Sequence, residues 1–185
     1  MYNAYIGQLL YEHIRMRRVG RVLERQLDIA ARCEEPDFIL LIRALDYLRG
    51  LPARLHHSRE DRLFERLRTV DTNLARELEM LRAQHQEIYQ LEDTLQELAV
   101  AAAKGGQAAY PRLLEAGRDY LRIRKSHSQL EERSVFPVAA RKLTPEDWQL
   151  LECPRLDDHG GSIDAEMHGR VLSLYRRLME QPKAA

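Results

Sequence analysis

The sequence has little of the material that disulfide-bonded, all-β or membrane-spanning proteins require. It contains only two cysteines, Cys33 and Cys153, which cannot form a disulfide framework and fit a reducing cytoplasm. Its nine glycines and seven prolines cluster instead of recurring at the spacing of β-turns, which argues against an all-β fold. No apolar run approaches the roughly 18–20 residues of a membrane span, and residues 1–18 contain a polar break followed by arginines. We therefore expect a cytoplasmic protein without a membrane helix or signal peptide.

Net charge is absent as well. The 29 Lys and Arg residues balance the 29 Asp and Glu residues, so recognition of a nucleic acid or a membrane through bulk charge is not expected. The sequence does contain 44% hydrophobic and 31% charged residues over 185 positions. This composition and length predict one folded domain with a single core.

Apolar residues recur at alternating steps of three and four through most of the chain, the pattern of helices that each bury one stripe. Turn signals near Pro36, Val70 and Gly105–Gly106 divide the pattern into four helices of roughly 25–35 residues. The Gly-Leu-Pro sequence at residues 50–52 predicts a kink or brief break in the second helix, because proline removes a backbone donor. Long helices joined by short turns predict an all-α fold, an up-down-up-down four-helix bundle over residues 1–143.

Residues 144–185 predict a C-terminal helical extension of this bundle. Residues 144–147, Thr-Pro-Glu-Asp, are typical of the cap and first turn of a short helix, which would hold Trp148. A loop is expected from residue 153 to 161, and residues 162–180 predict a last amphipathic helix.

Four histidines and two glutamates occupy positions where the helical stripes call for apolar residues. Residues four apart lie on one helical face, so a histidine and a glutamate at this spacing project in one direction. The residues are His13 in the first helix, His56 and Glu60 in the second, His85 in the third, and His127 and Glu131 in the fourth.

Residue counts from the turns place these groups at one height. His13 lies 21 residues before Glu34 in the first turn, and His56 lies 22 residues after it. His85 and His127 each lie 21 residues from the second glycine of the third turn. At about 1.5 Å per residue, each antiparallel pair of histidines is level to within about one helical turn.

The predicted layer of polar groups calls for a compensating charge. Buried carboxylates are costly unless they are paired or bound to a cation, and only Arg124 is a candidate cation from the same layer. Mixed imidazole and carboxylate ligation suits iron, manganese or zinc, and two carboxylates able to bridge indicate two metal ions. The alternative is a set of isolated, hydrogen-bonded histidines. The occurrence of four histidines at one height together with two glutamates favours the metal site over this alternative.

Three further polar residues directly follow candidate ligands and point about 100° away around the helix. They are His57, Asp61 and Glu132. We expect His57 to face solvent or to lie behind the ligands, and Asp61 and Glu132 to stay outside the ligand set.

The motifs around these residues resemble the hemerythrin-like family, the HHE cation-binding domains, over about residues 1–143. The matching stretches are residues 12–14, 56–64, 84–88 and 127–137. The resemblance implies a four-helix bundle that holds two non-haem iron ions joined by an oxo or hydroxo bridge. It also implies terminal ligands at His13, His56, His85 and His127, and bridging carboxylates at Glu60 and Glu131.

One position departs from the oxygen-carrying members of that family, which have a further histidine four residues after that of the third helix. Here the position is Tyr89. A phenol, with a pKa of about 10, is normally neutral and is a poorer iron(II) ligand. The smaller ligand set leaves open positions on the metals and is associated with reaction with, or sensing of, oxygen, nitric oxide or peroxide, and with iron handling.

Hydrogen bonds from neighbouring side chains should orient the imidazoles around a bound metal. The candidates near the helix seams are Tyr89, Glu92, Tyr120 and Arg124. Tyr89 lies one turn beyond His85, which favours an orientation toward the site. For the other three, an ordinary position at the edge of the core is the favoured interpretation.

The leading interpretation is a di-iron protein that binds, senses or reacts with oxygen, nitric oxide or peroxide, with no dedicated catalytic activity beyond weak reduction of peroxide or oxygen. The ferritin-like carboxylate enzymes need Glu-x-x-His motifs, and none of the seven histidines has a glutamate three residues before it. Two alternatives remain. One is iron storage or donation for the repair of damaged iron centres. The other is a metal-free interaction bundle whose last helix packs against a partner or a second copy, forming a homodimer.

Overall fold

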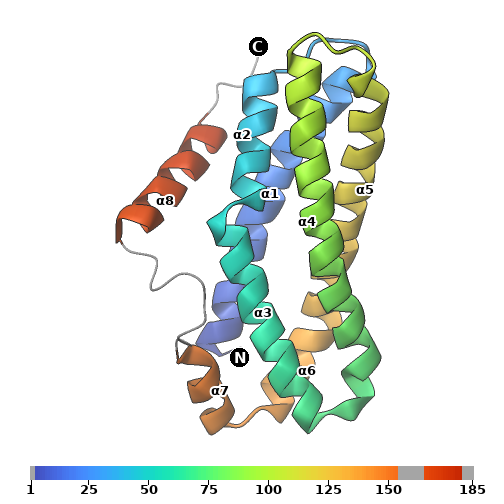
Figure 1. The fold of residues 1–185 in the computed structure, drawn as a ribbon. Coiled ribbons are helices and arrows are strands. Elements are labelled where there is room, and N and C mark those ends of the chain that lie inside the picture. The colour runs from blue at the N-terminus through green and yellow to red at the C-terminus, as the bar shows by residue number, and fades with distance from the viewer. Residues whose placement is uncertain (1–2, 154–164, 181–185) are drawn as a thin grey trace.

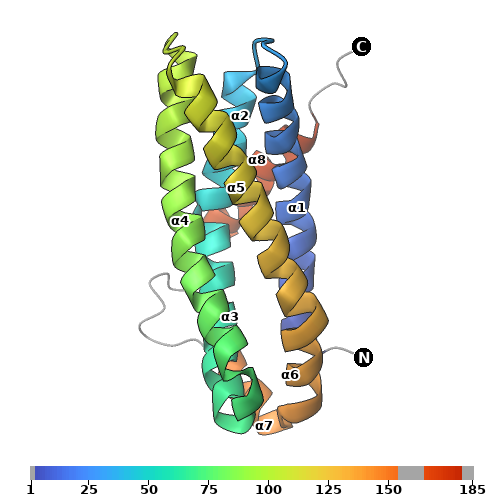
Figure 2. The same cartoon turned by 90° about the vertical axis from the view of Figure 1, so that its right-hand side faces the viewer.

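The protein is a bundle of four long rods that run side by side in alternating directions (Figure 1, Figure 2). The computed structural model describes residues 3–153 and 165–180, and no strand occurs in these ranges. The predicted all-α bundle is thereby confirmed. The first rod is one helix, the second is two helices in line, the third is one helix, and the fourth continues from one helix into another. The helices are α1 (Ala4–Ala31), α2 (Phe38–Arg49), α3 (Leu51–Val70), α4 (Ala75–Ala103), α5 (Ala109–Leu130) and α6 (Phe136–Lys142).

Short polar side chains define where several helices begin. Asp37 caps α2, since its carboxylate accepts a hydrogen bond from the backbone N–H of Leu40 at 2.9 Å. Asp71 accepts from the N–H of Asn73 at 3.1 Å and starts a 3₁₀ turn (Thr72–Leu74) that leads into α4.

The expected interruption of the second rod lies at Gly50, between α2 and α3. Its backbone is extended, with ψ of −178°, so the α-helix stops for one residue and restarts at Leu51. A Cβ atom at this position would lie only 2.8 Å from the carbonyl oxygen of Asp46, which explains why glycine occupies it. The proline two residues later fits the first turn of α3, where its missing N–H is not needed.

A π-helical turn (Glu131–Val135) joins α5 to α6. Such turns add a residue to a helix and are frequent at functional sites. The fourth rod therefore continues through α6 to Lys142.

The hydrophobic core is divided in two along the bundle axis. One cluster fills the end where α2 packs on α1 and α4 and these two helices pack on α5, and it includes Val19, Leu45 and Leu95. The other fills the end around α3 and α6, and includes Leu63 and Phe136. The buried histidines, together with Glu60 and Glu131, lie at sequence positions between the two clusters, so apolar side chains close off the polar layer on both sides.

Two further helices follow the bundle. α7 (Pro145–Glu152) packs on α3, where Arg66 donates a hydrogen bond to Asp147 at 2.7 Å. α8 (Ala165–Met179) crosses the outside of α1 and α2 (Figure 1). These are the two helices expected after the bundle, although residues 162–164 of the second lie outside the described residues.

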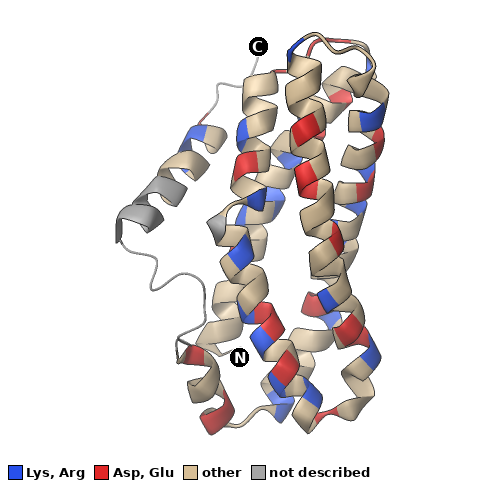
Figure 3. Ribbon diagram, in the orientation of Figure 1, with Lys and Arg blue, Asp and Glu red and all other residues tan. Residues whose placement is uncertain are grey.

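Basic and acidic residues are interspersed along the helices of the bundle (Figure 3). Within the described ranges, none of the helices combines the length and apolar character needed to cross a membrane.

Candidate metal centre

The structure brings all six predicted ligands into one buried layer of the bundle. Their exposed fractions lie between 0% and 4%, so none of the six is accessible over more than a small edge. Four rods contribute: α1, α3, α4, and the fourth rod at the end of α5 and the start of the π-helical turn. The residues are His13, His56, Glu60, His85, His127 and Glu131.

Glu60 lies at the centre of this layer. Its Oε1 atom is 2.8 Å from Nε2 of His56 and 3.2 Å from Nε2 of His13. Its Oε2 atom is 3.3 Å from Nε2 of His85, on the other side of the carboxylate. The two oxygens of Glu60 therefore face two different groups of imidazoles, the arrangement that a bridging carboxylate needs.

Glu131 spans the same two groups from the fourth rod. Its Oε2 atom is 3.4 Å from Nε2 of His13, and its Oε1 atom is 3.2 Å from Nε2 of His127. The Nε2 atoms of His127 and His85 face each other at 3.2 Å. Each carboxylate thus faces one group made by α1 and α3 and another made by α4 and α5.

His57 does not face solvent, and that part of the expectation for it is wrong. Its side chain is only 4% exposed, and its ring stacks on that of His85 with centroids 4.3 Å apart. Its Nδ1 atom lies 2.9 Å from the hydroxyl of Tyr89, so its Nε2 atom remains available. Potential ligand atoms of His57, Glu60, His85 and His127 all lie within 4.8 Å of one another, and those of His13, His56 and Glu60 form a second such group.

The burial of both neighbours in sequence has a simple cause. α3 packs between α1 and α4, so its inward face is broad. His56 lies on the side of that face toward α1, where its partner is Glu12, and His57 lies on the side toward α4, where its partner is Tyr89. A rotation of about 100° therefore moves a side chain from one seam to the next without taking it out of the core.

The outward nitrogen of each of the four predicted histidine ligands has a hydrogen-bond acceptor on the neighbouring rod. An Nδ1–H donated to a carboxylate or amide oxygen fixes the tautomer and leaves the inward Nε2 lone pair for a metal. The pairs are His13 with Glu132 at 2.8 Å, His56 with Glu12 at 2.8 Å, His85 with Asp61 at 3.1 Å, and His127 with Gln84 at 3.1 Å.

These four acceptors form a closed ring around the bundle. The acceptor on α1 bonds to the histidine of α3, and the acceptor on α3 bonds to the histidine of α4. The acceptor on α4 bonds to the histidine of α5, and the acceptor in the π-helical turn bonds to the histidine of α1. The signal that could have found them is adjacency, since each directly precedes or follows a candidate ligand in sequence. They are Glu12, Asp61, Gln84 and Glu132.

The four candidates for orienting the imidazoles divide into two groups. Tyr89 does face the site, through His57. Glu92, Tyr120 and Arg124 instead bond to one another: the Tyr120 hydroxyl donates to Glu92 at 2.7 Å and accepts from Arg124 at 2.8 Å. No hydrogen bond among the described residues joins these three to the predicted ligands.

The charges of the layer shift its pKa values. Burial works to lower the pKa of His85, but Asp61 and Glu60 outweigh it and raise that pKa to about 9. The pKa of His13 is likewise raised well above its ordinary value by carboxylates, against the effect of burial. Burial lowers the pKa of His57 well below its ordinary range, so its imidazole is neutral at pH 7.

Three carboxylate oxygens in this layer lack a hydrogen bond. They are Oε2 of Glu60 and both oxygens of Glu131, all buried, with imidazole nitrogens 3.2–3.4 Å away but not aligned for hydrogen bonding. Buried carboxylate oxygens normally have partners, because an ionised carboxylate costs far more to remove from water than a neutral polar group unless it is paired or bound to a cation. Imidazole nitrogens and carboxylate oxygens at this spacing are the donor set of iron, manganese and zinc sites, so the residues fit a metal centre.

The comparisons agree with this geometry. The family model of the hemerythrin HHE cation-binding domain matches residues 5–139, most of the chain. The chain therefore belongs to the hemerythrin HHE cation-binding domain family, and the two groups of histidine and glutamate side chains are its candidate cation site. Comparison with curated proteins and with solved structures finds no match.

Proposed function

We propose that this protein holds two non-haem iron ions and binds, senses or reacts with oxygen, nitric oxide or peroxide. The observation that carries the proposal is the position of Glu60 and Glu131, each with its two oxygens directed at different groups of imidazoles. One ion would be held by His13 and His56, and the other by His85 and His127 together with His57. Both carboxylates would bridge the two ions.

The addition of His57 makes the two positions unequal. The first ion would have two imidazoles and two carboxylate oxygens, which leaves room for a small ligand. The second would have three imidazoles and two carboxylate oxygens. His57 thus supplies from α3 the third imidazole that Tyr89 does not supply from α4, and Tyr89 orients it.

A pair of ferrous ions supplies two electrons to dioxygen or peroxide. The chain's own residues prepare the site for that chemistry. The outer ring of acceptors holds each imidazole in the tautomer that binds metal. The two apolar clusters, with Phe136 stacked 5.8 Å from His13, keep bulk water from the layer along the bundle axis. A metal-free interaction bundle would bury Glu60 and Glu131 with only imidazoles to compensate their charges, which speaks against that alternative.

Metal analysis of ligand variants tests the proposal. Protein loaded anaerobically with Fe²⁺ and then exposed to air should contain two irons per chain and show the near-ultraviolet absorption of an oxo-bridged diferric pair. Glu60→Ala and Glu131→Ala should lose both ions, because each removes a bridge. His57→Ala should retain one ion tightly and weaken the other. Glu97→Ala, at an exposed position of α4, is the matched control and should keep two irons.

One iron per chain in the unaltered protein, or full retention of both irons in Glu60→Ala, would contradict the proposed centre. Two irons in His57→Ala with unchanged affinities would restrict the ligands to the six residues that the sequence indicates.

A further inference from the structure

A cavity of about 480 Å³ lies in the groove between α1 and α5 and reaches the candidate metal centre. Four imidazoles form part of its wall, from His13, His56, His57 and His127. The rest of the lining comes mainly from the residues that follow His13 on α1 and those around His127 on α5. The cavity therefore connects the groove to the ligand layer from the side, along the first apolar cluster.

The volume of this cavity is far greater than a diatomic molecule or hydrogen peroxide needs. A water molecule in the liquid occupies about 30 Å³, so the cavity could hold roughly sixteen of them. Cavities of about 300–1,000 Å³ are the size that takes small organic ligands. Its apolar wall, which includes Met16, Ile88 and Leu121, suits a ligand with an apolar body.

The charged lining is predominantly basic, although the chain as a whole is neutral. Five basic side chains line the cavity, against the two carboxylates of Glu24 and Glu132. Glu132 is already paired, since its Oε1 atom lies 2.5 Å from Arg17 and 2.8 Å from Nδ1 of His13. The five basic residues are Arg17, Arg21, Arg124, Lys125 and Arg133.

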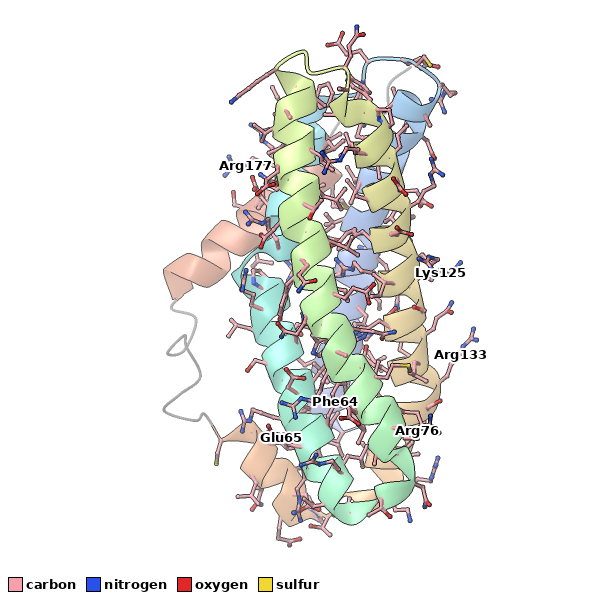
Figure 4. The ribbon with its side chains drawn as sticks, turned by 45° about the vertical axis from the view of Figure 1, so that its right-hand side comes forward. Phe64, Glu65, Arg76, Lys125, Arg133 and Arg177 are labelled. Carbon is pink, nitrogen blue, oxygen red and sulfur yellow. The ribbon has the colours of Figure 1, made fainter. Side chains whose placement is uncertain are left out.

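Three of these cations have no ionic partner in the part of the chain that the structure describes. No carboxylate there lies within 4 Å of Arg21, Lys125 or Arg133. Arg21 comes from α1, and Lys125 and Arg133 extend outward from the fourth rod (Figure 4). Positive charge on both sides of a groove concentrates anions in it.

Arg124 is the basic residue whose position is most closely fixed. Its guanidinium donates to the Tyr120 hydroxyl at 2.8 Å and lies over the Tyr120 ring, 5.5 Å from the centroid. Tyr120 is in turn held by the buried carboxyl of Glu92. The half-buried Arg124 thus presents a positioned cation to the cavity, one turn along α5 from His127.

We propose that this cavity binds a small organic carboxylate, with its charged group among the basic side chains of α1 and α5 and its apolar body against Met16, Ile88 and Leu121. The position of the ligand beside metal ions rests on the proposed function, whereas the anion site itself rests on the cavity and its charges. Such a ligand would lie between solvent and the ligand layer, and would therefore control which small molecules reach the metals.

Calorimetric titration of the iron-loaded protein with benzoate, and with neutral benzamide of the same shape, tests the proposal. Benzoate should bind and benzamide should bind at least tenfold more weakly. The Arg21→Gln/Lys125→Gln variant should weaken benzoate binding about 25-fold, since each exposed charge at about 4 Å contributes about fivefold. The matched control is Arg118→Gln/Arg122→Gln, which removes the same charge from an exposed face of α5 outside the cavity. It should bind benzoate as the unaltered protein does.

Equal affinities for benzoate and benzamide would overturn the proposal, as would equal losses in the two double variants. Iron content measured on the same samples separates this inference from the proposed function. Two irons per chain without benzoate binding would overturn the organic-anion site and leave the metal centre standing. Benzoate binding at least tenfold tighter than benzamide binding, in protein that takes up no iron, would support the anion site and contradict the proposed function.

Discussion

Loading the centre with a divalent metal should release protons, and the number can be derived from the metal-free protein. The pKa of His85 is raised to about 9, so at pH 7 this imidazole is about 99% protonated. Carboxylates raise the pKa values of His13 and His127 as well, against the effect of burial. A protonated Nε2 cannot bind a metal, so each of these imidazoles must lose its proton first.

The expected release at pH 7 is at least one proton per chain, from His85, and as many as three. His57 contributes none, because burial lowers its pKa and it is already neutral. For each proton that metal binding displaces, the apparent metal affinity rises about tenfold with every unit increase in pH, as long as the pH is below the pKa of that group. Between pH 6 and pH 8 the affinity should therefore rise about 100-fold through the proton of His85 alone, and further for each additional imidazole that is protonated in the metal-free protein.

Calorimetric titration with Zn²⁺ in two buffers of different ionisation enthalpy measures this release directly. Above pH 9.5 the release should fall, because His85 then loses its proton before metal arrives. Full metal binding at pH 7 with less than one proton released would refute the reasoning, because it would mean that the carboxylates do not hold His85 protonated. The Asp61→Ala variant provides the internal control, since removing that carboxylate should lower the release at pH 8.

Other substitutions test the surroundings of the centre and the packing of the bundle. Asp61→Ala should weaken metal binding roughly 10–100-fold in a direct titration, with the helix content by circular dichroism unchanged, because it removes the group that orients one imidazole. Burial raises the pKa of Glu92 to about 7, so its ionisation lowers the stability of the fold as pH rises. In urea titrations the unaltered protein should lose about 2–3 kcal/mol of unfolding free energy through this group between pH 5 and pH 8. Glu92→Gln should abolish that loss. Gly117→Ala should destabilise by about 1–3 kcal/mol in the same assay, because the new Cβ would lie 2.5 Å from Leu27. Gly20→Ala, with nothing within 4 Å, should stabilise α1 by about 0.5–1 kcal/mol, and a destabilisation would contradict the open space there.

The sequence was sufficient for the fold because the helical stripes and the turn residues agree. The break at the Gly-Leu-Pro sequence between α2 and α3 and the turns near Pro36, Val70 and Gly105 all occur where the pattern indicates. The level of the polar layer also followed from residue counts, because short turns between antiparallel helices leave little freedom in their relative heights.

The width of the inward face of α3 could not be read from the sequence. A single stripe predicts that His56 faces inward and that His57, rotated by about 100°, does not. The width of a buried face depends on how many neighbours a helix has, and α3 contacts both α1 and α4. For the same reason the sequence left open whether Glu92, Tyr120 and Arg124 orient the imidazoles or occupy ordinary positions at the edge of the core. They bond to one another, and neither their rotation nor their partners are encoded locally.

The ring of acceptors ties the geometry of the centre to the packing of the whole bundle. Adjacent residues on a helix point about 100° apart, so when one faces the bundle axis the next lies along a seam and reaches the neighbouring rod. Glu12 and His13 are such a pair on α1, and Glu131 and Glu132 are another in the π-helical turn, where the extra residue of the turn adjusts both directions. Each of these four histidines is therefore oriented by a residue of a different rod from the one that supplies it. A shift of any one rod would misplace its own ligand and release the imidazole of the next, so metal binding must favour the one arrangement in which all four rods are docked together.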